Sequence, residues 1–108
     1  MTEPFVRPDV RLFLDYLNNL PGPKTYEMEP AEARTLMAGM RHVGDLPVGE
    51  LALIRDLVMP GPGGELKLRL YDARATREPG PLFVFFHGGG FVLGDLDSHE
   101  PFCAEMAR

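Results

Sequence analysis

The sequence is poor in the features that mark several large classes of protein. Its 108 residues include a single cysteine, Cys103, which excludes an internal disulfide and indicates a reducing compartment. No apolar run approaches the roughly 18 residues of a membrane span. The first ten residues, MTEPFVRPDV, lack the charged and apolar regions of a secretory signal. These absences predict a cytoplasmic protein without a membrane span.

Basic residues are also in the minority. Eleven lysines and arginines stand against 16 aspartates and glutamates, which gives a net charge of −5, and the basic residues form no cluster. A surface of this kind does not attract a phosphate backbone, so nucleic acid is not expected as a partner.

Two helical patterns fill the first half of the chain. Pro8 suits a first helical turn, and apolar residues then recur at helical spacing until Pro21-Gly22-Pro23. A second helix is expected from Glu29-Pro30, with an apolar stripe that reaches Val43 and with Gly44 as the residue just after its C-terminus. Both stripes are typical of core packing, and some of their residues could also line a substrate pocket.

A strand pattern replaces the helical pattern from Leu51 onward. Segments 51–59 and 65–73 are expected to form an antiparallel hairpin around the turn chemistry of residues 60–64. In the second segment leucines alternate with Lys67, Arg69 and Tyr71, which indicates one buried face and one solvent-exposed face.

The run Leu82–Phe86 is apolar at every position, which is typical of a strand covered by helices on both faces. After it, a helix is expected from about Asp97 to Arg108, capped by Asp97 or Ser98, with a buried side formed by Phe102, Cys103 and Met106. A strand, a loop and a helix in this order begin a βαβ unit. The expected fold class is α/β with a mixed, mostly parallel sheet, and the chain is interpreted as the N-terminal part of a larger domain.

Three consecutive glycines, Gly88–Gly90, follow the expected buried strand. The N–H groups of Gly89 and Gly90 could converge on a negatively charged oxygen at the strand end, where ligands bind in open α/β sheets. These N–H groups could bind either the oxyanion of an acyl-transfer reaction or a phosphate. The phosphate-binding patterns G-x-x-x-x-G-K-[ST] and G-x-G-x-x-G do not fit the sequence, which favours the oxyanion.

The segment His87-Gly88-Gly89-Gly90-Phe91, followed by GDLDSH at residues 94–99, resembles the oxyanion-hole region of the hormone-sensitive-lipase family of bacterial esterases. The upstream layout, two helices and then a hairpin, also resembles the start of that family. The resemblance implies an α/β-hydrolase fold and a carboxylesterase that uses a serine nucleophile and no cofactor.

The resemblance also implies roles for individual residues. Gly89 and Gly90 would be the oxyanion-hole donors, and Gly88 and His87 would support the loop. Residues 1–49 would form part of a cap, or lid, and residues 50–108 the start of the catalytic domain. The implied substrate is a small acyl ester, and the residues expected to contact it are Phe91, Leu93, Met37 and Met40. A homo-oligomer is compatible with these expectations.

The sequence departs from the family in having no G-x-S-x-G segment. Its only serine, Ser98, is expected to cap a helix and not to point toward the neighbouring His99, and Cys103 has no evident activating partner. Asp95, Asp97 and His99 alternate like metal ligands, but capping and loop hydrogen bonds account for them, so no metal is expected.

The triad is therefore expected in the C-terminal remainder of the protein, which would be the partner of this chain. Two alternatives stay open. One is a receptor-like module of the same fold that binds a small ligand, and the other is a catalytically incompetent fragment.

Overall fold

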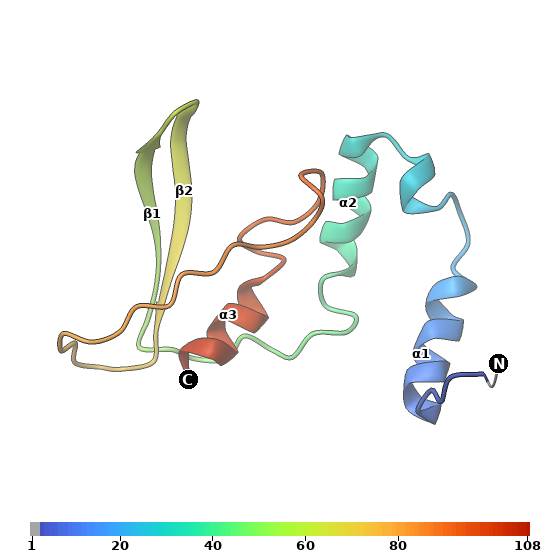
Figure 1. Cartoon of the computed structure of the whole chain (residues 1–108), viewed down its shortest axis with the longest axis horizontal. Helices are drawn as coiled ribbons and strands as arrows, with labels where there is room; N and C mark the ends of the chain where they lie inside the picture. The colour runs from blue at the N-terminus through green and yellow to red at the C-terminus, as the bar shows by residue number, and fades with distance from the viewer. Residues whose placement is uncertain (1–2) are drawn as a thin grey trace.

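The computed structural model describes residues 3–108, so Met1 and Thr2, the first residues of the expected cap segment, lie outside the described range. The elements in chain order are α1 (Pro8–Asn18), a single 3-10 turn η1 (Thr25–Glu27), α2 (Pro30–Met40), β1 (Leu53–Gly61), β2 (Gly64–Asp72) and α3 (Glu100–Ala107). The hairpin and α1 lie at opposite ends of the molecule, with α2 and α3 between them (Figure 1).

Both N-terminal helices begin at a proline, as the sequence predicts. The side chain of Glu32 accepts the N–H of Glu29 at 3.3 Å, which satisfies a backbone donor that the first turn of α2 leaves free. Helix α2 ends earlier than predicted, at Met40. The expectation that Gly44 follows its last turn is wrong, because the chain turns at once and Val43 N–H bonds to the carbonyl of Met40 at 2.9 Å.

The predicted hairpin is confirmed. Strands β1 and β2 pair antiparallel in a register that places Leu57 opposite Leu68 and Gly61 opposite Gly64. Pro62-Gly63 forms the two-residue connection, and the fixed φ of proline suits the first central position of such a turn. On the face that alternation predicts to be open, Lys67 is exposed, but α3 lies against β2 and leaves only 13% of the Arg69 side chain exposed. The prediction that the leucine face is buried is wrong for the described chain, since Leu66 and Leu68 are 49% and 37% exposed.

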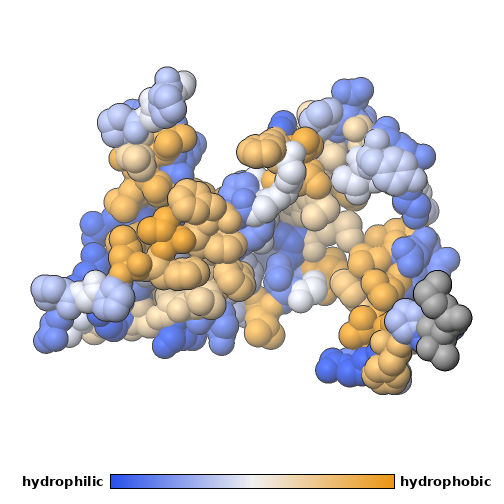
Figure 2. Space-filling view, viewed as in Figure 1, coloured by the Kyte–Doolittle hydropathy of each residue, from blue (hydrophilic) through white to orange (hydrophobic). Residues whose placement is uncertain are grey.

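The prediction of a buried strand at Leu82–Phe86 is wrong for the described chain. The segment belongs to no strand, and its side chains are open to solvent, with Phe83 66% and Phe86 85% exposed. A strand needs a neighbour for its backbone hydrogen bonds, and the only strands within residues 3–108 pair with each other. Figure 2 shows apolar surface where this part of the chain crosses the hairpin, and again over α1.

Helix α3 differs from its prediction in its cap and in its buried side. The N-cap residue is His99, without a side-chain capping bond, and not Asp97 or Ser98. Cys103 is half-buried, whereas Phe102 and Met106 are 48% and 54% exposed. The fully covered residue of α3 is Ala104. The aromatic ring of Phe102 instead contacts that of Phe85, with centroids 4.9 Å apart.

Little of the described chain is enclosed. Among residues 3–108, only Ala33 of α2 and Ala104 of α3 are buried apolar residues. None of the helices in this range combines the length and apolar character that crossing a bilayer demands.

Candidate functional site

The glycine loop contains two consecutive residues in the left-handed region, after a glycine with a larger positive φ. The φ angles are +137° at Gly89, +61° at Gly90 and +62° at Phe91. Within the described range, the N–H groups of Gly89 and Gly90 donate to no carbonyl and no side chain. Two adjacent backbone donors therefore remain free at the point where the sequence predicts an oxyanion hole.

A tight turn fixes the loop at Gly89. The N–H groups of Val92 and Leu93 both donate to the carbonyl of Gly89, at 3.1 and 2.9 Å. A Cβ on Gly89 would clash with the carbonyl of Leu93. Glycine is required here both by its φ and by this close approach.

His87 and Gly88 contact each other beside this turn. The Nδ1 atom of His87 lies 2.8 Å from the carbonyl oxygen of Gly88, so the tautomer protonated at Nδ1 donates to it. The ring of His87 also stacks on that of His99, with centroids 5.2 Å apart. A Cβ on Gly94 would come within 2.8 Å of both His87 Nδ1 and the Gly88 carbonyl oxygen. The close approach of these two groups therefore favours glycine at position 94 as well.

Of the four expected substrate contacts, two follow the glycines in the loop and two lie on α2. Phe91 is fully exposed and Leu93 is half-buried, both directly beside the glycines. On α2, Met37 is 44% exposed and Met40 is half-buried. Their role in binding substrate stays a prediction.

Ser98 is held in a loop turn instead of capping α3. Its hydroxyl accepts the N–H of Asp95 at 2.9 Å, and its own N–H donates to the Asp95 carboxylate at 2.7 Å. This backbone bond holds the pKa of Asp95 below its usual range. The expectation that Ser98 and His99 point apart is wrong, since Ser98 Oγ lies 3.0 Å from His99 Nδ1. The turn nevertheless occupies the Ser98 hydroxyl.

Cys103 is the other candidate nucleophile in the chain. Burial, and then the negative charge of Glu100, raises the pKa of its thiol. A raised pKa reduces the thiolate fraction at neutral pH, which argues against a nucleophilic role.

Arg69 links the hairpin to the segment that follows the glycine loop, a role that the sequence analysis missed. Its guanidinium contacts Asp56 at 2.6 Å, Asp97 at 2.8 Å and Glu100 at 2.6 Å. The Arg69 guanidinium lowers the pKa of Asp56, and the hydrogen bond with Asp56 is the main cause of the raised pKa of Arg69. The sequence places Arg69 on one face of a strand, but it does not show that α3 covers that face.

Two arginines of the α2 region approach the same loop from the other side. Arg34 donates its Nε–H to the carbonyl of Val92 at 2.7 Å. Arg41, the residue after α2, lies 3.6 Å from the Asp97 carboxylate. Sequence spacing gives no signal for either contact, because each joins segments more than 50 residues apart.

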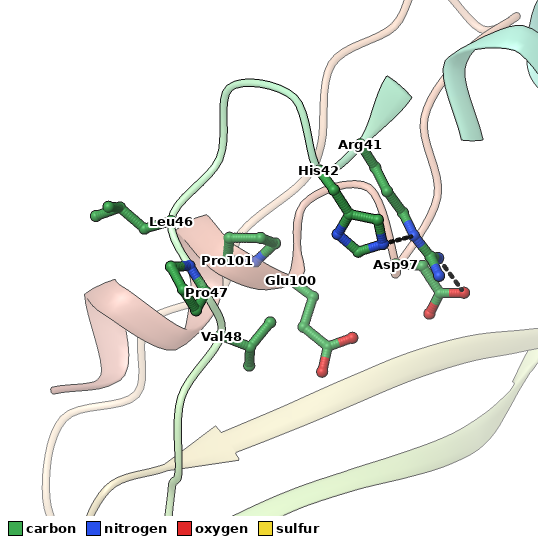
Figure 3. Close-up of a pocket in the computed structure, with 8 residues that line it drawn as sticks. All are labelled: Arg41, His42, Leu46, Pro47, Val48, Asp97, Glu100 and Pro101. Atoms are coloured by element: carbon green, nitrogen blue, oxygen red, sulfur yellow. Dashed lines mark hydrogen bonds and ion pairs between the residues drawn. The ribbon is translucent and has the colours of Figure 1, made fainter. Parts of the chain in front are cut away.

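A groove of about 450 Å³ lies between the chain after α2 and the start of α3. Figure 3 shows its lining, in which Arg41 points toward Asp97 and His42 toward Arg41. None of the residues expected to contact substrate lines this groove. It is therefore distinct from the glycine loop.

The part of the chain that contains the glycine loop is similar to a known family. A family model described as the alpha/beta hydrolase fold matches residues 83–108. The chain is 48% identical over 55 residues to the carboxylic ester hydrolase LipN of Mycobacterium tuberculosis, which covers 51% of this chain and 14% of LipN. It is 36% identical over 70 residues to the esterase LipI of the same organism, which covers 63% of this chain and 22% of LipI.

The fold is similar to that of solved esterases. A thermostable esterase from Pseudomonas putida superposes with a TM-score of 0.82 at 24% identity, over 98% of this chain and 33% of that chain. The chain thus spans from 14% to 33% of the length of these three proteins. The resemblance to carboxylic ester hydrolases is confirmed, and the chain is similar to about a third of a solved α/β-hydrolase-type esterase.

Proposed function

We propose that the whole protein is a carboxylic ester hydrolase with a serine nucleophile, and that this chain supplies its oxyanion hole. The observation that carries the proposal is the pair of free N–H groups at Gly89 and Gly90, on a backbone turn that glycine alone permits at Gly89. The similar proteins LipN and LipI, a carboxylic ester hydrolase and an esterase, support it.

In this proposal the serine oxygen attacks the ester carbonyl carbon, and the carbonyl oxygen becomes an oxyanion. Gly89 and Gly90 donate their N–H groups to that oxygen, while a histidine accepts the serine proton and passes it to the leaving alcohol as the ester C–O bond breaks. Water then attacks the acyl-serine by the same steps and releases the carboxylic acid. Ser98 does not serve as the nucleophile, because its hydroxyl already bonds within the Asp95 turn. The serine, histidine and acid come from the remainder of the protein.

We assign His87 and Gly88 to support of the loop and residues 3–49 to part of the cap. The bond from Arg34 to the Val92 carbonyl supports the second assignment, because it places α2 against the glycine loop. Phe91 and Leu93 would then contact the acyl group beside the oxyanion hole, and Met37 and Met40 would face it from the cap. The substrate is a small acyl ester.

Hydrolysis of p-nitrophenyl esters of increasing acyl length by the full-length protein tests the proposal. We expect turnover that a phosphonate inhibitor abolishes at one equivalent, because the phosphonate traps the serine. The 108-residue chain alone is the control, and it should release no p-nitrophenol and bind no phosphonate. A folded full-length protein that neither hydrolyses esters nor reacts with the phosphonate contradicts the proposal.

A further inference from the structure

Helix α2 holds the glycine loop at a point two residues beyond Gly90. Arg34, in the second turn of α2, donates to the carbonyl of Val92 at 2.7 Å, across 58 residues of sequence. Within residues 3–108, no other side chain from outside the loop bonds to a carbonyl of residues 88–93. The loop is therefore attached to the cap segment through this one arginine.

The residue next to this attachment is strained. Phe91 has a φ of +62°, a region that bulky L-residues avoid. Such a conformation is unfavourable for a bulky residue and persists only where the surroundings hold it. From inside the loop, Val92 and Leu93 donate to Gly89 O. From outside, Arg34 fixes the carbonyl of Val92 and with it the Val92–Leu93 peptide plane, one residue beyond the plane that follows Phe91.

Arg34 is directed toward the loop by this bond alone, since it has no carboxylate partner within the described range. Arg41 follows seven residues later, about two helical turns, and therefore projects from the same side of the helix. It contacts Asp97 beyond the far end of the loop. The two arginines thus contact this region from one side of α2, Arg34 at Val92 within the loop and Arg41 at Asp97 beyond it.

We propose that Arg34 is a positioning residue for the oxyanion hole, which couples the place of the cap helix α2 to the orientation of the Gly89 and Gly90 N–H groups. The inference rests on the proposed function. Arg34 itself touches no reacting atom. Loss of its bond releases the Val92 carbonyl, lets Phe91 relax toward negative φ and turns the adjacent N–H donors away from the oxyanion.

Steady-state kinetics of the full-length protein test this coupling. We expect Arg34→Met to lower kcat about tenfold while KM changes less than about twofold, because the donors act mainly in the transition state. Arg34→Lys should recover part of kcat, since an ammonium group also donates to a carbonyl. The matched control is Arg55→Met, which removes the same charge at an exposed residue whose side chain forms no hydrogen bond or ion pair within the described range.

Hydrogen exchange gives a readout that does not depend on turnover. The Val92 and Leu93 amides should exchange at least about fivefold faster in Arg34→Met than in Arg55→Met, with equal melting temperatures. Equal kcat in these two variants, or a raised KM with kcat unchanged, overturns the positioning role and leaves the proposed function standing. If the unmutated protein hydrolyses no ester, the proposed function fails, and hydrogen exchange alone tests whether Arg34 holds the loop. Equal exchange of the Val92 and Leu93 amides in the two variants overturns the coupling.

Discussion

Asp95 stabilises the turn that leads from the glycine loop into α3. Its carboxylate accepts the N–H of Ser98 at 2.7 Å, and its own N–H donates to the Ser98 hydroxyl at 2.9 Å. This reciprocal pair explains why Ser98 does not cap α3. The charge of Asp95 thus contributes to the stability of this turn, and Asp95 has no assigned contact with the substrate.

The charge of Asp95 should give a measurable pH dependence of stability. Its pKa is lowered in the folded protein, so its contribution is present above the unfolded pKa near 4 and disappears as pH falls through the folded pKa. We expect Asp95→Asn to melt about 1–3 °C lower than the unmutated full-length protein at pH 7, with the difference closing below about pH 4. Thermal melts across pH check this.

Asp45→Asn is the matched control for that variant, because Asp45 is exposed and has no hydrogen bond or ion pair within the described range. It should show no such pH-dependent difference. A difference for Asp95→Asn that persists unchanged to acid pH contradicts the assignment of the effect to the carboxylate charge.

At the scale of elements, the segments with strong local signals were predictable. Pro8 and Pro30 mark the helix starts because proline fits a first turn, and Pro62-Gly63 marks the hairpin because it fits a tight connection. The structure of segment 82–86 was not predictable, because an apolar run forms a strand only where a neighbouring strand accepts its backbone hydrogen bonds.

The candidate site divides in the same way. The glycines and His87 were predictable from one short motif, whose residues are neighbours in sequence. The contacts of Arg34 and Arg69 were not, because each joins the loop region to an element 28 to 58 residues away. Periodicity records which face of a strand or helix a residue occupies, and not which distant group meets it.

Arg69 should be the residue on which docking of α3 against the hairpin most depends. Replacing Arg69 with an uncharged residue leaves the carboxylates of Asp56, Asp97 and Glu100 close together without the cation that offsets their mutual repulsion. We expect Arg69→Met to lower the free energy of unfolding of the full-length protein by about 1–3 kcal/mol, below the value for a fully buried pair because Asp56 and Asp97 are more than half exposed. Denaturant unfolding measures it.

The free energy of unfolding of Arg69→Lys should lie between those of Arg69→Met and the unmutated protein. One ammonium group cannot bind three carboxylates with the geometry of a guanidinium. Arg55→Met on the neighbouring strand removes the same charge and serves as the control. A loss for Arg69→Met no larger than that of the control contradicts the bracing role.

At the scale of the whole molecule, the described chain has more surface than a self-contained domain. It exposes 9243 Å², whereas a folded monomer of this size exposes about 6,000 Å². Its radius of gyration is 17.7 Å, against about 13 Å for a compact domain of 100 residues. The open apolar surface includes residues 82–86, directly before the glycine loop. The rest of an α/β-hydrolase sheet would cover this segment.

We propose that this chain provides an oxyanion hole to a nucleophile located elsewhere in the protein. The most direct test of this proposal is the measurement of kcat and KM for full-length Gly89→Pro and Gly90→Pro, each of which removes one backbone N–H. Gly22→Pro is the control, because Gly22 also has a positive φ, +103°, but lies after α1 and outside the loop. We predict that kcat falls about 10²–10³-fold in the two loop variants with little change in KM, and stays near its original value in the control. An unchanged kcat in a folded Gly89→Pro or Gly90→Pro protein would contradict the account.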